Sequence, residues 1–233
     1  MTLSNRKILR TLLCLLAGTL YAVCLSACGA KEPLSENRDA EIESPVIAND
    51  LSNQKVTAIA EDTQGHIWIG TFRGLNKNNV HDYHQYFCTD DSLGLPDNQI
   101  THLLRDSKNR FWVGTVNGVC LYTDKDNFRI IPIEADNKNV RQILEDRNGR
   151  IFLNTGFQLY AYHPREEKIT CVLPEISPGN AFYAQCHIAP DNNLWVMTST
   201  GLRCYDPSTL QLKESVALSG YPYYSYLHNN ELW

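Results

Sequence analysis

Short apolar stretches that alternate with turn residues recur along most of this chain, and they predict strands. Residues Val56–Glu61 form one such stretch, and residues 66–71 form the next after a polar turn. Gly74 opens a third stretch, and a fourth follows near residues 83–88. Four short strands joined by turns are expected to form one small antiparallel sheet.

The same unit recurs along the chain, as the aromatic residue of its second strand shows. These residues are Trp68, Trp112, Phe152, Trp195 and Trp233, at steps of 44, 40, 43 and 38 residues. Repeats of this length, made of short strands, are typical of β-propellers. The sequence therefore predicts an all-β fold, a β-propeller of four-stranded blades over residues 51–233. The expected blades are residues 51–90, 95–133, 138–174 and 181–216, with the start of a fifth at 221–233.

Each repeat carries a short motif around its first hairpin, made of an aspartate, a turn residue, an aromatic residue and a small residue. The members are Asp62, Gly65, Trp68, Gly70, Asp106, Asn109, Trp112, Gly114, Asp146, Gly149, Phe152, Asp191, Trp195 and Trp233. We expect the aspartate to accept backbone N–H groups of its turn and the turn residue to supply a positive φ. The aromatic residue should pack on the next blade, and the small residue should permit its close approach. These roles are structural and assign the aspartates no catalytic function.

The fourth repeat departs from the others, because only three residues separate Asp191 from Trp195. The pattern therefore predicts a hairpin that is two residues shorter in blade 4. Four blades and the beginning of a fifth do not close a seven-blade ring, the usual size, and Trp233 falls within an expected strand. We expect an incomplete ring, from a truncated reading frame or a fragment of a longer protein.

The N-terminus has the features of a bacterial export signal. Arg6, Lys7 and Arg10 precede an apolar run over residues 11–25, which is short for a membrane span. The run ends in the residues Leu25, Ser26, Ala27 and Cys28, which resemble the lipobox of bacterial lipoproteins. We therefore expect a lipoprotein-type signal peptide at 1–27, lipidation of Cys28 and a flexible linker at 28–50. A plain signal peptide and an uncleaved anchor stay open as alternatives.

The net charge of the chain limits the kinds of partner that it can bind. The chain has 21 Lys and Arg against 26 Asp and Glu, a net charge of −5, which disfavours nucleic acid as a partner.

Export would place the cysteines in an oxidising compartment, where disulfides can form. Cys88 with Cys120, and Cys171 with Cys204, take similar positions in adjacent repeats. Both pairs are candidate inter-blade disulfides, and the alternative is that these are small buried residues.

The repeats resemble the two-component-regulator propeller family. The resemblance is carried by Leu-Pro-Asp-Asn-Gln-Ile at 95–100, Glu61 with Asp62, Gly65, Ile-Trp-Ile-Gly-Thr at 67–71 and Gly74 with Leu75. It covers residues 51–233 and is strongest in the first two repeats.

This resemblance implies the extracytoplasmic sensor region of a hybrid two-component sensor kinase, followed by further blades, a membrane helix and a histidine kinase. It also implies a small-molecule or oligosaccharide ligand and leaves a homodimer as an option. Together with the signal, it places the chain in a Gram-negative periplasm, held by a lipid anchor.

Candidate ligand contacts lie in the loops that join the second strand of each blade to the third. Arg73, Asn117, Phe157 and Thr200 take one equivalent place, five residues after each aromatic residue. They differ while the scaffold around them repeats, which suits a binding rim at the mouth of a propeller. Phe157 could stack on a sugar face, and Arg73 and Asn117 could hydrogen-bond hydroxyl groups. Ordinary loop variation is the alternative.

No other chemistry stands out in the sequence. His81, His84 and Cys88 have donor spacing, but a step of three along a strand places the two histidines on opposite faces, so we expect no metal site. No cofactor motif, catalytic motif or kinase region is present, so we expect no enzyme activity within this chain. A lipoprotein that docks another envelope protein and a propeller lyase or glycosidase are the alternative functions.

Overall fold

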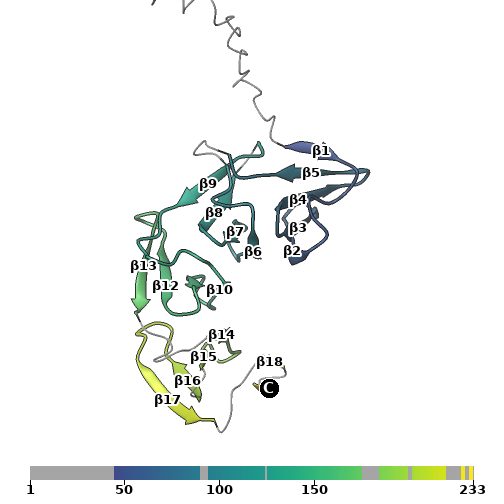
Figure 1. Ribbon diagram of the computed structural model, residues 1–233. Helices are drawn as coiled ribbons and strands as arrows, with labels where there is room; N and C mark the ends of the chain where they lie inside the picture. The colour runs from purple at the N-terminus through teal and green to yellow at the C-terminus, as the bar shows by residue number, and fades with distance from the viewer. Residues whose placement is uncertain are drawn as a thin grey trace, which may run out of the picture. The chain divides into compact units, whose positions relative to one another are not determined.

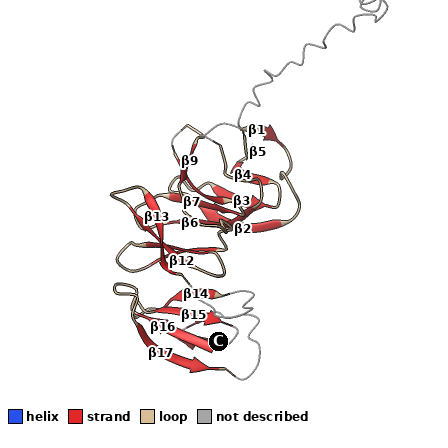
Figure 2. Cartoon of the chain, turned by 60° about the vertical axis from the view of Figure 1, so that its left-hand side comes forward, coloured by secondary structure: helices blue, strands red, loops and turns tan. Residues whose placement is uncertain are grey.

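The computed structural model describes residues 45–89, 94–123, 125–174, 184–198, 201–218, 227–228 and 231–232. All regular structure in these ranges is β-strand, which confirms the all-β prediction (Figure 2). The described part of the chain accordingly offers no helix that could cross a membrane. The expected signal peptide, Cys28 and most of the expected linker lie outside the described residues.

Four antiparallel sheets follow one another along the chain, and in each of them four consecutive strands form a simple meander (Figure 1). Blade 1 contains β2 (Val56–Glu61), β3 (Ile67–Thr71), β4 (Gly74–Asn79) and β5 (Asp82–Tyr86). Blade 2 contains β6 (Ile100–Arg105), β7 (Phe111–Thr115), β8 (Gly118–Tyr122) and β9 (Phe128–Ile131). Blade 3 contains β10 (Gln142–Glu145), β11 (Ile151–Asn154), β12 (Leu159–His163) and β13 (Lys168–Leu173). Blade 4 contains β14 (Gln185–Ile188), β15 (Leu194–Thr198), β16 (Gly201–Tyr205) and β17 (Leu212–Ala217), and a pair, β18 (Leu227–His228) and β19 (Glu231–Leu232), follows.

Blade 1 has a fifth strand that the sequence did not reveal. β1 (Val46–Ala48) pairs antiparallel with β5, at the outer edge of the sheet. These three residues were expected to belong to the flexible linker. Their backbone pairs with β5 because that strand would otherwise present an unpaired edge.

Successive blades pack face to face, with their first strands closest together. β2 contacts β6, β6 contacts β10, and β10 contacts β14. The buried apolar side chains form three clusters, and each cluster fills the junction between two successive blades. This arrangement is that of propeller blades around an axis, with the first strand of each blade innermost.

The described blades do not close a ring. Ile59 of β2 is 66% exposed and Ile67 of β3 is 38% exposed, on the face of blade 1 that points away from blade 2. At the other end, every residue of β17 is exposed. The prediction of an incomplete ring is therefore confirmed for the part of the chain that the structure describes.

The junction between blades 2 and 3 holds a histidine with a perturbed pKa. His102 lies on β6 opposite Gly114, and its burial lowers the pKa of the imidazole, although a hydrogen bond with the Ile143 backbone acts in the other direction. An unfolded chain binds a proton on this residue near pH 6.5, and the folded chain does so only at lower pH. Stability linked to His102 is therefore present above pH 6.5 and is lost as the pH falls toward the folded-state pKa.

We expect the free energy of unfolding to decrease between pH 7 and pH 5, and to decrease less in a His102→Gln variant. Urea denaturation at several pH values, followed by circular dichroism, measures this slope. The matched control is His81→Gln, since His81 is exposed. Equal slopes in wild type and His102→Gln would contradict the assignment.

Candidate functional site: the loop rim and its scaffold

The aspartate and the tryptophan of the repeat are bonded to each other, a contact that the sequence pattern did not reveal. The indole Nε1 of Trp68 donates to Asp62 Oδ2 at 2.8 Å, and Trp112 donates to Asp106 Oδ2 at the same distance. Asp62 Oδ1 also accepts the backbone N–H groups of Gln64 and His66, as expected for the turn. Burial raises the pKa of Asp62, but the hydrogen bonds from Trp68, His66 and Gln64 outweigh it, so the pKa lies below its usual value.

A cationic side chain completes this unit in the second and third blades. Arg110 Nε donates to Asp106 Oδ2 at 2.6 Å, and its guanidinium lies 5.1 Å from the centre of the Trp112 ring. Arg150 repeats this with Asp146 at 2.9 Å and lies 5.5 Å from the Phe152 ring. Blade 3 therefore keeps its aspartate bonded although phenylalanine has no N–H group to donate.

The turn residues have positive φ values, and Gly70 lies close to the next blade. Gly65, Asn109 and Gly149 have φ values of +83°, +62° and +72°. A Cβ atom on Gly70 would lie 2.5 Å from Ile100 Cγ2 of the next blade. The glycine therefore permits close contact of blade 1 with blade 2.

Asp191 does not take the place of the repeat aspartate, so the prediction of a shorter hairpin in blade 4 is wrong. The backbone bonds that close the hairpin in blade 1 join Asp62 to Gly65 and His66, and in blade 4 the same bonds join Ala189 to Asn192 and Asn193. Ala189 is therefore the equivalent of Asp62, and the two hairpins have equal length.

Asp191 lies at the tip of the hairpin of blade 4, where it accepts the backbone N–H of Asn193. Asn192 supplies the positive φ, at +67°. Ala189 has no side-chain oxygen to accept the indole of Trp195, and this tryptophan is only partly buried. The burial expected of the repeat aromatic is thus incomplete in blade 4.

The repeat threonine shapes the loop that carries each candidate ligand contact. Thr71 Oγ1 donates to the Gly74 carbonyl at 2.8 Å and accepts the backbone N–H of Arg73 at 3.1 Å. Thr115 makes the same two bonds with Gly118 and Asn117, at 3.0 and 3.2 Å. The buried threonine thereby fixes the loop backbone, while the side chain at its tip faces solvent.

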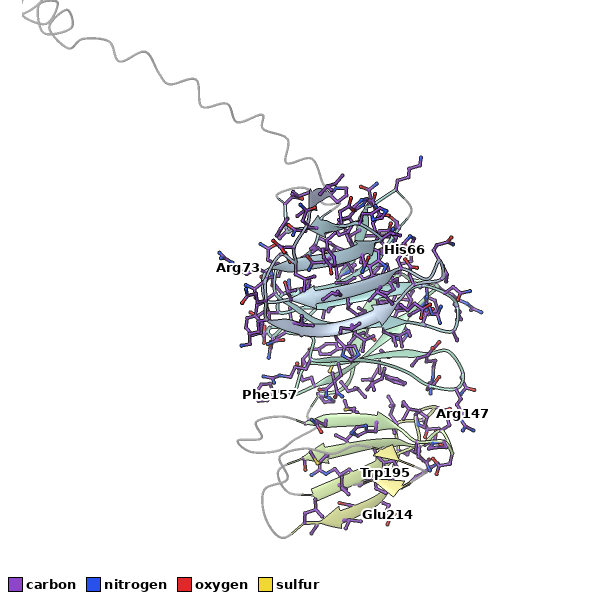
Figure 3. All side chains as sticks on the ribbon, turned by 90° about the vertical axis from the view of Figure 1, so that its right-hand side faces the viewer. His66, Arg73, Arg147, Phe157, Trp195 and Glu214 are labelled. Atoms are coloured by element: carbon purple, nitrogen blue, oxygen red, sulfur yellow. The ribbon has the colours of Figure 1, made fainter. Side chains whose placement is uncertain are left out.

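The structure gathers three of the four predicted contacts on one face, which we call the rim. The rim consists of Arg73, Asn117 and Phe157, all exposed, and Phe157 keeps 45% of its surface accessible. Figure 3 shows Arg73 and Phe157 at one edge of the sheets and His66 and Arg147 at the opposite edge. Thr200, the fourth predicted contact, lies outside the described residues.

Three further side chains adjoin the rim, those of Lys55, Phe72 and Arg141, and the sequence analysis did not indicate them. Lys55 Nζ lies 3.7 Å from the centre of the Phe72 ring, beside Arg73. A Cβ atom on Gly156 would lie 2.9 Å from Arg141 Nε, so the Arg141 side chain passes over the loop that carries Phe157. Lys55 and Arg141 come just before the first strand of their blades, so blade periodicity could have indicated them.

The predicted disulfides are absent. Cys120, Cys171 and Cys204 carry free thiols, so neither pair is bonded. The reason is the difference in their surroundings. Cys120 is fully buried in the junction between blades 1 and 2, whereas Cys88 is exposed and lies two residues beyond the end of β5. Among the described residues, no group of three or more His, Cys, Asp or Glu could hold a metal ion.

The sequence matches a known family model in two places. The model described as two component regulator propeller matches residues 50–73 and 94–117. These two segments cover the first two strands of blades 1 and 2 and end at Arg73 and Asn117. The predicted resemblance is thereby confirmed for these repeats. No curated protein matches the sequence.

Solved structures share the fold at low sequence identity. The extracellular domain of a protein described as a hybrid two component system from B. thetaiotaomicron has 24% identity and a TM-score of 0.60, over 71% of this chain and 22% of that chain. A virginiamycin B lyase from Staphylococcus aureus has 19% identity and a TM-score of 0.60, over 82% of this chain and 66% of that chain. The chain thus spans about a quarter of the length of the extracellular domains from B. thetaiotaomicron that it resembles. At this identity the likeness establishes the propeller fold, which these extracellular domains and the lyases share.

Proposed function

We propose that this chain is a sensing region of a two-component signal transduction protein and that its rim binds a small ligand. The observation that carries the proposal is the match of two repeats to the two component regulator propeller model. The propeller geometry supports it, because loops held on a rigid scaffold are the usual place for ligand contacts. The kinase that would receive the signal belongs to sequence outside this chain.

We further propose that the ligand is an oligosaccharide. Phe157 offers an exposed ring that can stack on the apolar face of a sugar, and Arg73 and Asn117 offer donors for hydroxyl groups. Their backbones are fixed by buried threonines in blades 1 and 2, which limits the entropy lost on binding. Ligand binding would then shift the packing of the propeller and transmit a signal through a membrane helix.

The expected location is the periplasm of a Gram-negative bacterium, with the chain held to the membrane by lipid on Cys28. The support is the order of basic, apolar and small residues that ends at this cysteine. Globomycin treatment of expressing cells tests lipidation by blocking the lipoprotein peptidase. Accumulation of an uncleaved precursor would support it, and unchanged processing would contradict it.

Binding at the rim is tested with a triple variant, Arg73→Ala/Asn117→Ala/Phe157→Ala. The fluorescently labelled full chain is applied to an array of neutral and acidic oligosaccharides, and each hit is then titrated in solution. Loss of one stacking contact and two hydrogen bonds should weaken binding by about 30-fold or more. The matched control on the opposite face is Arg147→Ala/Asn148→Ala, which should bind as the wild type does.

Three results would overturn parts of this proposal. Wild-type affinity in the triple variant would remove the ligand site from the rim. Binding of no oligosaccharide would contradict a carbohydrate ligand and favour the protein-docking scaffold. Conversion of a bound sugar into a product would assign the chain to the lyases or glycosidases.

A further inference from the structure

A pocket lies on the face opposite the rim, at the junction of blades 1 and 2. Its volume is about 290 Å³, which is at the small end of the range for ligand sites. Its walls come from the first hairpins of both blades, from β4 and from the last hairpin of blade 2. The lining residues are Asp62, Thr63, Gln64, Lys77, Arg105, Asn109, Phe111, Tyr122, Thr123 and Lys125.

Cationic side chains dominate the charge of this pocket. Lys77, Arg105 and Lys125 line it, together with the carboxylate of Asp62. The carboxylate of Asp126 adjoins the pocket, because it accepts a hydrogen bond from the Tyr122 hydroxyl at 3.0 Å, so three cations stand against two carboxylates. The Asp62 carboxylate already accepts hydrogen bonds from Trp68, Gln64 and His66. Within the described ranges, none of the ion pairs involves one of the three cations. The pocket therefore has a surplus of positive charge.

Two of the cations are held in place by the scaffold. Lys77 Nζ lies 5.4 Å from the centre of the Trp68 ring and 5.5 Å from that of the Tyr122 ring, so it sits between the two blades. Arg105 Nη1 donates to the backbone carbonyl of Asp62 at 3.2 Å. A guanidinium has five N–H donors, so this bond anchors the group and leaves others for a ligand. Fixed donors lower the entropic cost of binding.

The neighbouring blades carry no cation at the strand positions of Lys77 and Arg105. Lys77 on β4 is the cross-strand partner of Trp68 on β3. The cross-strand partners of Trp112 and Phe152 in the next two blades are Leu121 and Ala161.

At the junction of blades 2 and 3, Arg110 takes the place that Lys77 has at the junction of blades 1 and 2. Its guanidinium lies 5.1 Å from the centre of the Trp112 ring and 5.2 Å from that of the Tyr162 ring, but it is paired with Asp106.

Arg105 is the last residue of β6, the first strand of blade 2. The residue at the same position is Glu61 in blade 1 and Glu145 in blade 3. Glu145 accepts a hydrogen bond from the backbone N–H of Ser107, across the junction of blades 2 and 3. The scaffold thus accommodates Leu or Ala in place of Lys77 and Glu in place of Arg105, and such departures from a repeat mark candidate functional positions.

We infer that this pocket binds a small organic molecule that carries an oxyanion group, namely a carboxylate, a sulfate or a phosphate. Arg105 and Lys125 would bind the anionic group through charge-assisted hydrogen bonds. The Tyr122 ring would contact the rest of the molecule. This site is separate from the rim, and it does not depend on the ligand proposed there.

The test is a titration of the full chain with glucuronate, glucose 6-sulfate, glucose 6-phosphate and neutral glucose, at constant ionic strength. At least one of the three anions should bind about tenfold or more tightly than glucose. The preferred anion identifies the group as carboxylate, sulfate or phosphate. The Arg105→Gln/Lys125→Gln variant should weaken this binding by about tenfold or more, since each charge-assisted bond contributes strongly.

The matched control is Lys55→Gln, which removes a cation from the opposite face. It should bind the anion as the wild type does, and the melting temperatures of both variants should stay near that of the wild type. Failure of all three anions to bind would overturn the inference. Unchanged affinity in Arg105→Gln/Lys125→Gln, or an equal loss in Lys55→Gln, would also overturn it.

Discussion

Replacement of Trp112 by alanine is expected to lower the free energy of unfolding by about 3–5 kcal/mol. Trp112 is fully buried in the cluster between blades 2 and 3, where its ring lies 4.9 Å from that of Tyr162. The alanine variant leaves a cavity at this junction and removes the indole bond to Asp106. Urea denaturation followed by circular dichroism measures the change.

Trp112→Phe separates the cost of the cavity from the cost of the hydrogen bond. Blade 3 already contains Phe152 at this position, and Arg110 would still donate to Asp106. We expect a loss of about 1.5–3 kcal/mol for this variant, which is the range for a single hydrogen bond to a charged group. Trp195→Ala should cost less than Trp112→Ala, because Trp195 is only partly buried. A loss below about 1 kcal/mol for Trp112→Ala would contradict the packing of the blades.

Replacement of Gly70 by alanine is expected to destabilise the fold by about 1–3 kcal/mol. The added Cβ would lie 2.5 Å from Ile100 Cγ2 and 3.0 Å from Ile100 Cβ. A β-branched side chain in a strand cannot rotate away freely, so blades 1 and 2 would have to move apart. The reduced entropy of the unfolded chain offsets only part of this cost.

Gly114→Ala is the matched variant at the next junction. Its Cβ would lie 3.1 Å from Val140 Cγ1 and 3.3 Å from Ile143 Cδ1, which is tight but short of a collision. We expect a smaller loss than for Gly70→Ala, in the same denaturation experiment. The reverse order would contradict the close approach of blade 2 to Gly70.

Much of the fold could be predicted because each repeat encodes its own sheet. Strand lengths, the turn glycines and the apolar residues on both faces are local features, and they recur at nearly constant spacing. The equivalence of Ala189 with Asp62 could not be predicted in this way. An aspartate two positions later gave a plausible alignment, and only the backbone bonds of the hairpin reveal the register. β1 is three residues long in a polar segment, and its pairing depends on β5, 35 or more residues away.

The two candidate sites differ in how well the sequence predicts them. The rim follows from periodicity, because Arg73, Asn117 and Phe157 take one place in successive repeats. The cationic pocket does not, because Lys77, Arg105 and Lys125 come from different elements of two blades. Only the packing of blade 1 on blade 2 brings these three residues to one cavity.

The most direct test of the central claim is the solvent accessibility of Trp68 and Trp112. The chain has four tryptophans, so a Trp195→Phe/Trp233→Phe variant reports on these two alone. Both are fully buried between blades, so we expect blue-shifted fluorescence and weak quenching by acrylamide. Emission and quenching like those of free tryptophan would show that the indoles face water, and would contradict the packing of successive blades.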